Sequence, residues 1–315
     1  MHKKVLLSGV KPTGLVHIGN YFGAMRQFLS LQDDYQAYIM IADLHSLTTV
    51  QDAKKLKEDT LNLALDYLAI GLDPEKIVLF KQSDVPEHAE LAWIFDCITT
   101  MPYLMRAHAY KDAEAKRKEI DAGTFTYPML MAADIFLYSP DIVPVGKDQK
   151  QHVEYARDTA EKFNRIFGET FKIPEPLILS EVETVPGIDG QKMSKSYGNT
   201  IPLFAEDEEI KKLCMSIVTD SSGERPENVY QIHKLFKSEK ELEVLYEEKK
   251  GKYKELKDAL IEDVIAFITP LREKRNKLAK DPQKVIDLLR TGAEKAKAVA
   301  SAKMTEVKEQ VGINL

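Results

Sequence analysis

The first two-thirds of the chain alternates short apolar runs with longer segments whose apolar residues recur at helical spacing. The strand-length apolar runs are residues 4–8, 37–42, 77–80 and 142–145. The segments with helical spacing are residues 20–31, 54–70, 87–100 and 149–166. Because the runs at 37–42 and 77–80 are apolar throughout, we expect strands that are covered on both faces. The alternation predicts a doubly wound α/β domain with a mainly parallel sheet over residues 1–200.

After about Thr200 the strand-like runs disappear and charged helical segments follow. These segments are residues 206–217, 226–236, 238–269, 271–279 and 282–311. We therefore expect a mostly helical second domain over residues 201–290. A C-terminal helix over residues 291–315 is expected to pack back on the first domain. Residues 181–200 are rich in Gly, Ser and Lys, which predicts a mobile loop between the two domains.

Composition and charge narrow the class of protein. With 44% hydrophobic and 30% charged residues the chain has the composition of an ordinary soluble globular protein, and no apolar run is long enough to span a membrane. A net charge of −6 argues against non-specific binding of nucleic acid, although residues 249–280 hold ten Lys/Arg against five Asp/Glu. Cys97 and Cys214 form no CxxC pair, so we expect neither a disulfide framework nor a zinc–thiolate site. The expected location is the reducing cytoplasm.

A glycine-containing segment, residues 8–20 (SGVKPTGLVHIGN), joins the first predicted strand to the first predicted helix. Gly9, Gly14 and Gly19 would let the backbone approach the phosphates and sugar of a nucleotide closely. The positive end of the helix beginning near Asn20 would favour the phosphate charge. Taken alone, the glycines fit ordinary turns equally well.

A second motif, Lys192-Met-Ser-Lys195-Ser196, follows some 170 residues later. Two lysines and two serines suit a loop that closes over phosphates, because lysine is a mobile point charge and serine adds hydrogen bonds. A solvated polar linker is the alternative. In this order, the two motifs resemble the signature motifs of class I aminoacyl-tRNA synthetases. The resemblance implies that both surround ATP and stabilise the charge that develops when a carboxylate attacks the α-phosphate.

A third segment, residues 127–138, is predicted to be a helix with Pro128 in its first turn. Met131 and Asp134 are three residues apart and share a face. A buried, unpaired carboxylate is costly, so Asp134 needs a hydrogen-bond donor from either a ligand or the protein. The segment resembles the specificity helix of tryptophanyl-tRNA synthetases, where the aspartate accepts a hydrogen bond from the indole N–H. Tyrosyl-tRNA synthetases have glutamine where Met131 stands.

The resemblance to this family also implies a set of site residues. Catalysis is assigned to Lys192, Lys195, Ser196 and Lys111. ATP binding is assigned to Lys11, Pro12, Thr13, His17, Gly19, Asn20, Gly146, Lys147, Asp148, Gln149, Val185, Lys192, Met193, Ser194, Lys195 and Ser196. Tryptophan binding is assigned to Leu7, Gly9, Asp43, His45, Tyr127, Met131, Asp134, Val143, Val145 and Gln149. No protein metal site is implied, because Mg²⁺ is held by ATP. The chain departs from many bacterial relatives in having lysine, rather than Gln and Glu, at positions 11 and 147.

The activity implied by the resemblance is ligation of L-tryptophan to tRNA(Trp) through tryptophanyl-adenylate, with ATP as the other substrate. It also implies a homodimer whose helical domain receives the anticodon. Three alternatives stay open on the sequence. They are a compact tyrosyl-tRNA synthetase, a nucleotidyltransferase that shares only the first ATP motif, and a non-catalytic paralogue that senses tryptophan.

Overall fold

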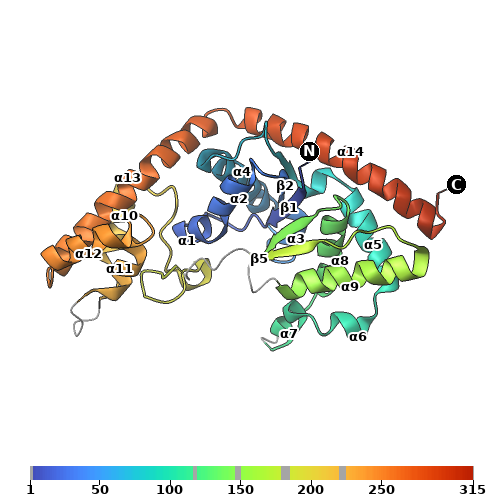
Figure 1. Ribbon diagram of the computed structural model, residues 1–315, viewed down its shortest axis with the longest axis horizontal. Coiled ribbons are helices and arrows are strands. Elements are labelled where there is room, and N and C mark those ends of the chain that lie inside the picture. The colour runs from blue at the N-terminus through green and yellow to red at the C-terminus, as the bar shows by residue number, and fades with distance from the viewer. Residues whose placement is uncertain (1–2, 116–118, 146–149, 179–184, 220–224, 315) are drawn as a thin grey trace.

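A five-stranded parallel sheet with the strand order β3-β2-β1-β4-β5 forms the centre of one part of the molecule (Figure 1). The computed structural model describes residues 3–115, 119–145, 150–178, 185–219 and 225–314. The strands are β1 (Val5–Val10), β2 (Gln36–Ile41), β3 (Val78–Lys81), β4 (Ile142–Val145) and β5 (Glu175–Ile178). All pairings between neighbouring strands are parallel. The predicted doubly wound α/β fold is therefore confirmed.

Strand β5 is the one strand of the described sheet that the hydrophobic pattern did not predict. Its four residues, Glu-Pro-Leu-Ile, begin with a charge and a proline, so no continuous apolar run marks it. It lies at the edge of the sheet and pairs only with β4. Proline is tolerated at an edge because one side of the strand needs no hydrogen-bonded partner.

Helices cover both faces of the sheet. The longer helices of this part are α4 (Ala53–Ile70), α5 (Glu87–Ile98), α8 (Ala122–Phe136) and α9 (Lys150–Phe167). The predicted helix at 20–31 is built from α1 (Ile18–Asn20), the π-helix η1 (Tyr21–Met25) and α2 (Arg26–Leu31). Shorter elements are α3 (Asp43–Ser46), the 3₁₀ turn η2 (Gln82–Asp84), α6 (Met101–Leu104) and α7 (His108–Ala115).

Helix α8 begins earlier than the sequence predicted. The Asp121 side chain caps it by accepting a hydrogen bond from the Thr124 N–H at 2.6 Å. Pro128 therefore lies inside the helix, and its predicted place in the first turn was wrong. The aspartate cap, rather than the proline, sets the start of the helix.

A second, helical part follows the sheet (Figure 1). It contains α10 (Asp207–Met215), α11 (Glu227–His233), α12 (Glu239–Glu248) and α13 (Tyr253–Ala279). The predicted helix at 238–269 is interrupted near Gly251, whose φ of 76° is left-handed. Conversely, α13 runs through Pro270, where the sequence predicted a break. Burial of Ile268 and Arg272 on either side of Pro270 holds the helix together there.

Helix α14 (Pro282–Val311) is one continuous helix that packs along the edge strand β3. The predicted boundary between residues 290 and 291 falls inside it. Gly292 is required at the crossing, because a Cβ there would lie 1.9 Å from the carbonyl oxygen of Leu79. Together, α13 and α14 form an arc that reaches from the helical part to the far side of the sheet (Figure 1).

Two apolar clusters fill the two faces of the sheet, because successive strand residues point to opposite sides. Leu6 and Ile39 belong to the cluster that includes α4 and continues into the helical part through Leu260 of α13. Leu7 and Met40 belong to the cluster beneath α5, α8 and α9. The sheet and the helical part therefore share one continuous core. Among the described residues, no helix has the length and apolar character needed to cross a membrane.

Candidate active site

A cavity of about 260 Å³ opens at the carboxyl ends of β1, β2 and β4. This is the point where the chain connections turn to opposite sides of the sheet, from β1 to β2 on one side and to β4 on the other. Doubly wound sheets bind ligands in this crevice. We call this cavity the switch-point pocket.

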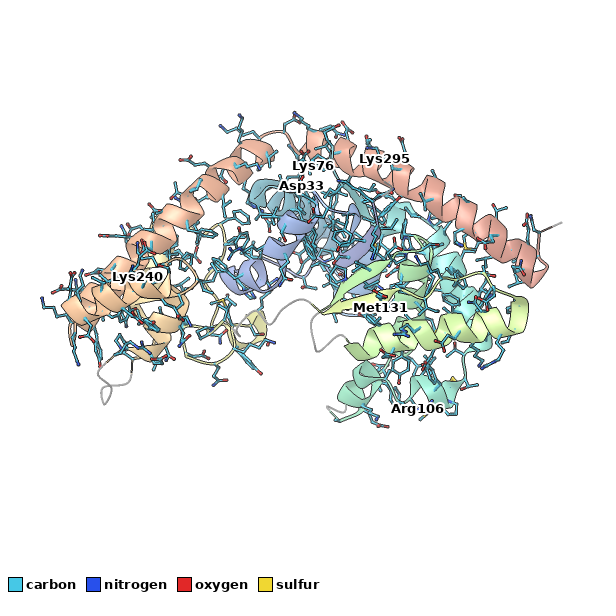
Figure 2. The ribbon with its side chains drawn as sticks, in the orientation of Figure 1. Asp33, Lys76, Arg106, Met131, Lys240 and Lys295 are labelled. Atoms are coloured by element: carbon cyan, nitrogen blue, oxygen red, sulfur yellow. The ribbon has the colours of Figure 1, made fainter. Side chains whose placement is uncertain are left out.

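Apolar side chains form most of the pocket wall. Leu7 from β1, Met131 from α8 and Val143 from β4 line it. Figure 2 places Met131 in the interior near the strands, whereas Lys240 and Lys295 stand on the outer helices. An apolar pocket with a few convergent polar groups is the usual form of a small-molecule site.

Most of the residues assigned to tryptophan by resemblance meet at this pocket. They are Leu7, Gly9, His45, Tyr127, Met131, Asp134 and Val143. Gln149 and the Val145 side chain lie outside the described residues. Asp43 is not among the lining residues. Its carboxylate instead accepts hydrogen bonds from the Ser83 N–H at 2.9 Å and the Ser83 hydroxyl at 2.6 Å, which ties α3 to the turn after β3.

Asp134 is the carboxylate among the lining residues of the pocket, and it is only 4% exposed. Its Oδ1 accepts hydrogen bonds from Gln82 Nε2 at 2.7 Å and His88 Nδ1 at 2.6 Å. Its Oδ2 accepts one from His45 Nε2 at 2.8 Å. Burial alone would raise the pKa of Asp134, but the interactions with His45 and His88 outweigh it and lower that pKa. The protein itself therefore supplies donors to this carboxylate, which stays ionised.

Sequence analysis did not single out Gln82 and His88. Both follow the carboxyl end of β3, Gln82 in η2 and His88 in α5. Ligands bind at the carboxyl ends of parallel strands, and Asp43 and His45, which the resemblance assigned, follow β2 in this way. Applied to β3, the same rule would have pointed to Gln82.

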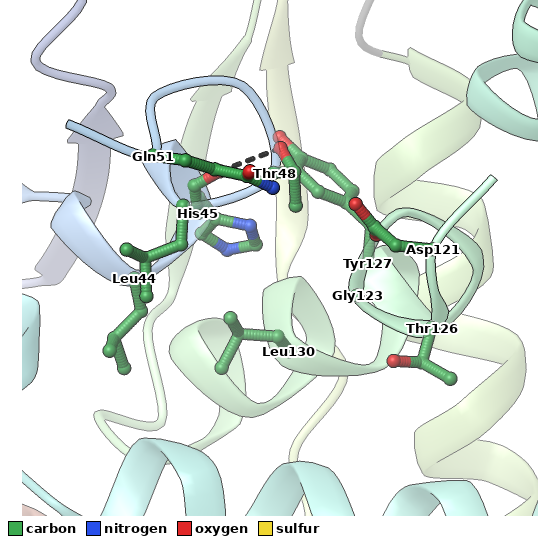
Figure 3. A pocket seen from close by; sticks show the side chains of 10 residues that line it. Leu44, His45, Thr48, Gln51, Asp121, Gly123, Thr126, Tyr127 and Leu130 are labelled. Atoms are coloured by element: carbon green, nitrogen blue, oxygen red, sulfur yellow. Dashed lines mark hydrogen bonds between the residues drawn. The ribbon is translucent and has the colours of Figure 1, made fainter. Parts of the chain in front are cut away.

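A second cavity of about 400 Å³ adjoins the first, and the His45 and Tyr127 side chains line both (Figure 3). The ring centroids of these two residues are 4.4 Å apart. Apolar Leu44, Leu47 and Leu130 form part of its wall. The two rings thus act as a partition between the second cavity and the switch-point pocket.

The glycine-containing segment at residues 8–20 folds around a reciprocal helix cap. His17 Nδ1 accepts a hydrogen bond from the Asn20 N–H at 3.3 Å, and Asn20 Oδ1 accepts one from the His17 N–H at 3.2 Å. A Cβ on Gly19 would lie 2.9 Å from His17 Nδ1 and 3.2 Å from Met193 Sδ, so glycine permits this approach. Burial, together with the charge of Lys195, lowers the pKa of His17 to about 4. The imidazole is therefore neutral at pH 7.

The second motif, residues 192–196, lies directly against this segment. Lys195 Nζ donates hydrogen bonds to the carbonyl oxygens of Thr13 at 2.8 Å and Gly14 at 3.0 Å. The Met193 N–H donates to the Val185 carbonyl at 2.9 Å, and both of these side chains are buried. After the motif, the Ile201 carbonyl accepts a hydrogen bond from the Ile18 N–H at 3.0 Å. Two segments some 180 residues apart in sequence thus form one polar surface.

Within this surface, burial lowers the pKa of Lys195, and the carboxylates of Asp59 and Asp66 partly offset that effect. Ser194 Oγ and Ser196 Oγ are 2.8 Å apart, within hydrogen-bonding distance. The Lys192 side chain is exposed. Lys195 therefore stands beside His17, with Lys192 and two hydroxyl groups in the same segment, a set of groups suited to phosphate oxygens.

Lys11 belongs to the segment at residues 8–20 and also lines the switch-point pocket. Its Nζ lies 4.7 Å from the centroid of the Tyr127 ring at the pocket wall, a cation–π contact. Burial lowers the pKa of Lys11. Pro12, which follows, is buried, whereas Thr13 is exposed.

Of the remaining assigned residues, one lies away from both cavities and four fall outside the described residues. Lys111 lies on α7 with an exposed side chain and lines neither cavity, although α7 packs on α8 through Tyr110 and Phe125, whose ring centroids are 5.5 Å apart. Gly146, Lys147, Asp148 and Gln149 lie outside the described residues. Among the described residues, no three His, Cys, Asp or Glu side chains are grouped to hold a metal ion.

A doubly wound sheet, an apolar pocket at its switch point and an adjoining cationic surface define a nucleotide-dependent enzyme of the α/β class. Comparison with known proteins is more specific, because the family described as tRNA synthetases class I (W and Y) matches residues 2–280. The tryptophan–tRNA ligase of Fusobacterium nucleatum is 49% identical over 98% of this chain and 97% of that protein. The ligase of Rhodopirellula baltica is 47% identical over 98% of this chain and 99% of that protein.

Solved structures agree with this family. The structure of tryptophanyl-tRNA synthetase from Campylobacter jejuni, complexed with ADP and tryptophan, matches with a TM-score of 0.91 and 45% identity over 98% of this chain and 99% of that chain. A tyrosyl-tRNA synthetase from Archaeoglobus fulgidus matches with a TM-score of 0.67 and 19% identity over 87% of this chain and 90% of that chain, a likeness of fold alone. The chain belongs to the class I tRNA synthetases for tryptophan and tyrosine, and within them to the bacterial type of tryptophanyl-tRNA synthetase.

Proposed function

We propose that this chain attaches L-tryptophan to tRNA(Trp) in two steps that consume ATP. In the first, a carboxylate oxygen of tryptophan attacks the α-phosphate of ATP and pyrophosphate leaves, giving tryptophanyl-adenylate. In the second, a hydroxyl of the 3′-terminal ribose of the tRNA attacks the activated carbonyl and AMP leaves. The observation that carries the proposal is an apolar pocket lined by the ionised Asp134 and by residues 9–11 of the first motif, against which Lys195 of the second motif packs.

Tryptophan recognition is assigned to the switch-point pocket. Leu7, Met131 and Val143 offer apolar surface to the indole ring. Asp134 Oδ2 uses one lone pair for His45 and keeps the other for the indole N–H. A site built around a required hydrogen bond rejects analogues without the donor by roughly 10⁴–10⁵-fold.

The phosphate groups of ATP are assigned to the surface formed by the two motifs. Lys192, Lys195 and Ser196 stabilise the negative charge at the α-phosphate during adenylate formation, and Lys111 is proposed to join them. His17 and Asn20 contact phosphate, and Gly19 leaves room for adenine. Little acid–base chemistry is needed from these residues, because positioning and charge stabilisation lower the barrier. Mg²⁺ is proposed to arrive bound to the phosphates of ATP.

The anticodon of the tRNA is assigned to the helical domain at residues 201–290, whose stretch from 249 to 280 is rich in lysine and arginine. Residues 1–200 form the proposed catalytic domain, and α14, which contains the start of the expected segment 291–315, packs on it. The proposed location is the cytoplasm.

We further propose that the active form is a homodimer. Trp93 is 68% exposed and Met101 64% exposed, and Cys97 between them is also exposed. Trp93 and Cys97 are four residues apart and lie on one side of α5, and Met101 begins α6 shortly after it, so a second copy would cover these exposed side chains. Trp93→Glu should convert a dimer to a monomer in light-scattering measurements. A wild-type monomer at micromolar concentration would contradict the dimer.

Amino-acid-dependent exchange between ATP and pyrophosphate tests the proposed reaction without tRNA. Exchange with tryptophan but not tyrosine is the expected result. Exchange with tyrosine alone would keep the fold and overturn the specificity. Folded protein that exchanges with neither amino acid would favour a tryptophan sensor or a nucleotidyltransferase.

A further inference from the structure

Behind Asp134, on the side away from the switch-point pocket, lies a buried layer of polar side chains. Gln82 and His88 are fully buried, and Tyr138 is 2% exposed. None of the three lines the described pocket. They come from the turn after β3, from α5 and from the residues just after α8.

His88 uses both ring nitrogens in this layer. Its Nδ1 lies 2.6 Å from Asp134 Oδ1, and its Nε2 lies 2.9 Å from the Tyr138 hydroxyl. An ionised carboxylate only accepts hydrogen bonds, so His88 Nδ1 carries a proton and donates it. Burial and the nearby Asp134 charge raise the pKa of Tyr138, which keeps its hydroxyl proton. When Nδ1 carries the only ring proton, Nε2 accepts a hydrogen bond from the Tyr138 hydroxyl, and His88 donates to Asp134.

Gln82 completes the set of donors to the same oxygen. Its Nε2 donates to Asp134 Oδ1 at 2.7 Å, and its Oε1 accepts a hydrogen bond from the His45 N–H at 3.4 Å. Gln82 and His88 together occupy both lone pairs of Oδ1. The remaining acceptor capacity of the carboxylate belongs to Oδ2, which His45 shares.

We infer that His88 is a positioning residue for tryptophan recognition, holding Oδ1 of Asp134 so that Oδ2 is presented to the indole N–H. This inference rests on the proposed function and names a residue that does not touch the substrate. A recognition group is selective only when neighbouring hydrogen bonds fix its orientation. Without the His88 donor, the carboxylate of Asp134 loses one of its three protein donors, one of the two at Oδ1, and can turn within the pocket wall.

A purely architectural role for His88 predicts something different. Loss of a buried histidine would then lower the stability of the protein and weaken the binding of all substrates to a similar degree. A positioning role predicts a selective loss, in which only the contribution of the indole N–H to tryptophan binding falls. An analogue of tryptophan in which the sulfur of benzothiophene replaces the indole N–H separates the two roles, because it keeps the shape and removes the donor.

The experiment measures pyrophosphate exchange with tryptophan and with the benzothiophene analogue in the wild type, His88→Leu, His88→Asn and His88→Gln. The wild type should prefer tryptophan by roughly 10⁴-fold, as expected for a required hydrogen bond. His88→Leu should reduce that preference by about tenfold to a hundredfold, the effect of leaving a buried acceptor unpaired. The KM for ATP should change by less than about twofold, since a lost donor alters only one contact.

The two polar variants guard against misfolding. The amide of asparagine can donate near the position of His88 Nδ1, whereas glutamine places its amide near Nε2. His88→Asn should therefore keep most of the preference that His88→Gln loses. His233→Leu is the matched control, because His233 is also fully buried and pairs with a carboxylate, Asp263 Oδ2, at 2.7 Å in the helical part. It should lower stability and leave the preference unchanged.

Each outcome decides one claim. A folded His88→Leu with the wild-type preference, or equal preferences in His88→Asn and His88→Gln, overturns the positioning role. Proportional rises in the KM values for tryptophan and ATP overturn it too, in favour of architecture. Wild-type protein that shows no exchange with tryptophan overturns the proposed function instead, and a wild type indifferent to the analogue removes Asp134 from recognition.

Discussion

The contact between α14 and β3 gives the most quantitative prediction, the effect of Gly292→Ala on stability. A Cβ at this position would lie 1.9 Å from the Leu79 carbonyl oxygen and 2.8 Å from the carbonyl carbon. Both atoms are backbone, so no side chain can rotate away. To reach an ordinary contact distance of 3.4 Å, the helix must move from the strand by more than an ångström. The buried residues on either side of Gly292, Leu289 and Ala296, would lose contact with it.

The magnitude follows from two opposing effects. Overpacking of this kind costs about 3 kcal/mol, the upper end of the usual range, because rigid backbone is involved. Replacing a helical glycine with alanine returns about 1 kcal/mol through helix propensity. The expected net loss is about 2 kcal/mol, which corresponds to a fall in Tm of about 4–8 °C.

Thermal and denaturant unfolding of Gly292→Ala and Gly23→Ala test this reasoning. Gly23 lies in η1, and a Cβ there would meet no atom within 4 Å. It should therefore show only the favourable propensity effect, with a rise in stability of up to about 1 kcal/mol. If Gly292→Ala were as stable as the wild type, or shifted in the same direction as Gly23→Ala, the close crossing of α14 over β3 would be refuted.

Three further predictions concern the site. Lys195→Ala should lower the rate of adenylate formation by more than about tenfold with little change in tryptophan affinity, because its charge acts on the transition state; pre-steady-state kinetics that show only an affinity loss would contradict this role. Asp134→Asn should reduce the preference for tryptophan over phenylalanine in pyrophosphate exchange, and undiminished selectivity would exclude Asp134 from recognition. The pKa of His17 is lowered from 6.5 to about 4 in the folded protein, so between these values the unfolded chain binds the extra proton. The contribution of His17 to the free energy of unfolding should be fully present above pH 6.5 and be lost as the pH falls towards 4. His17→Asn, which keeps a good helix cap, should show a flatter dependence of unfolding free energy on pH over this interval, and an unchanged slope would count against the assignment.

Much of the α/β fold could be predicted because its strands are buried on both faces. The runs at 37–42 and 77–80 are apolar throughout, and they form β2 and β3 to within a residue or so. Prediction failed where the local signal competed with packing. Pro270 looked like a helix end, yet the contacts of α13 with the rest of the core keep the helix intact across it.

The motifs of the site were also visible in the sequence, because glycines, lysines and a carboxylate at those spacings have recognisable chemistry. Met131 and Asp134 could be placed on one helical face from their spacing alone. What the Asp134 carboxylate contacts could not be predicted. The sequence left open whether its donor came from a ligand or from the protein, and the structure brings Gln82 and His88 to it from 52 and 46 residues away.

The sequence by itself determined which segments are buried, which are helical and which side chains carry chemistry. Periodicity encodes burial and direction along one element, so these features need no distant partner. Only the tertiary structure decided which groups meet. It joins Lys195 to Thr13 across 182 residues and covers β3 with a helix from the other end of the chain. A hydrogen bond requires alignment of two groups at about 3 Å, and that alignment exists only after the strands and helices have packed together.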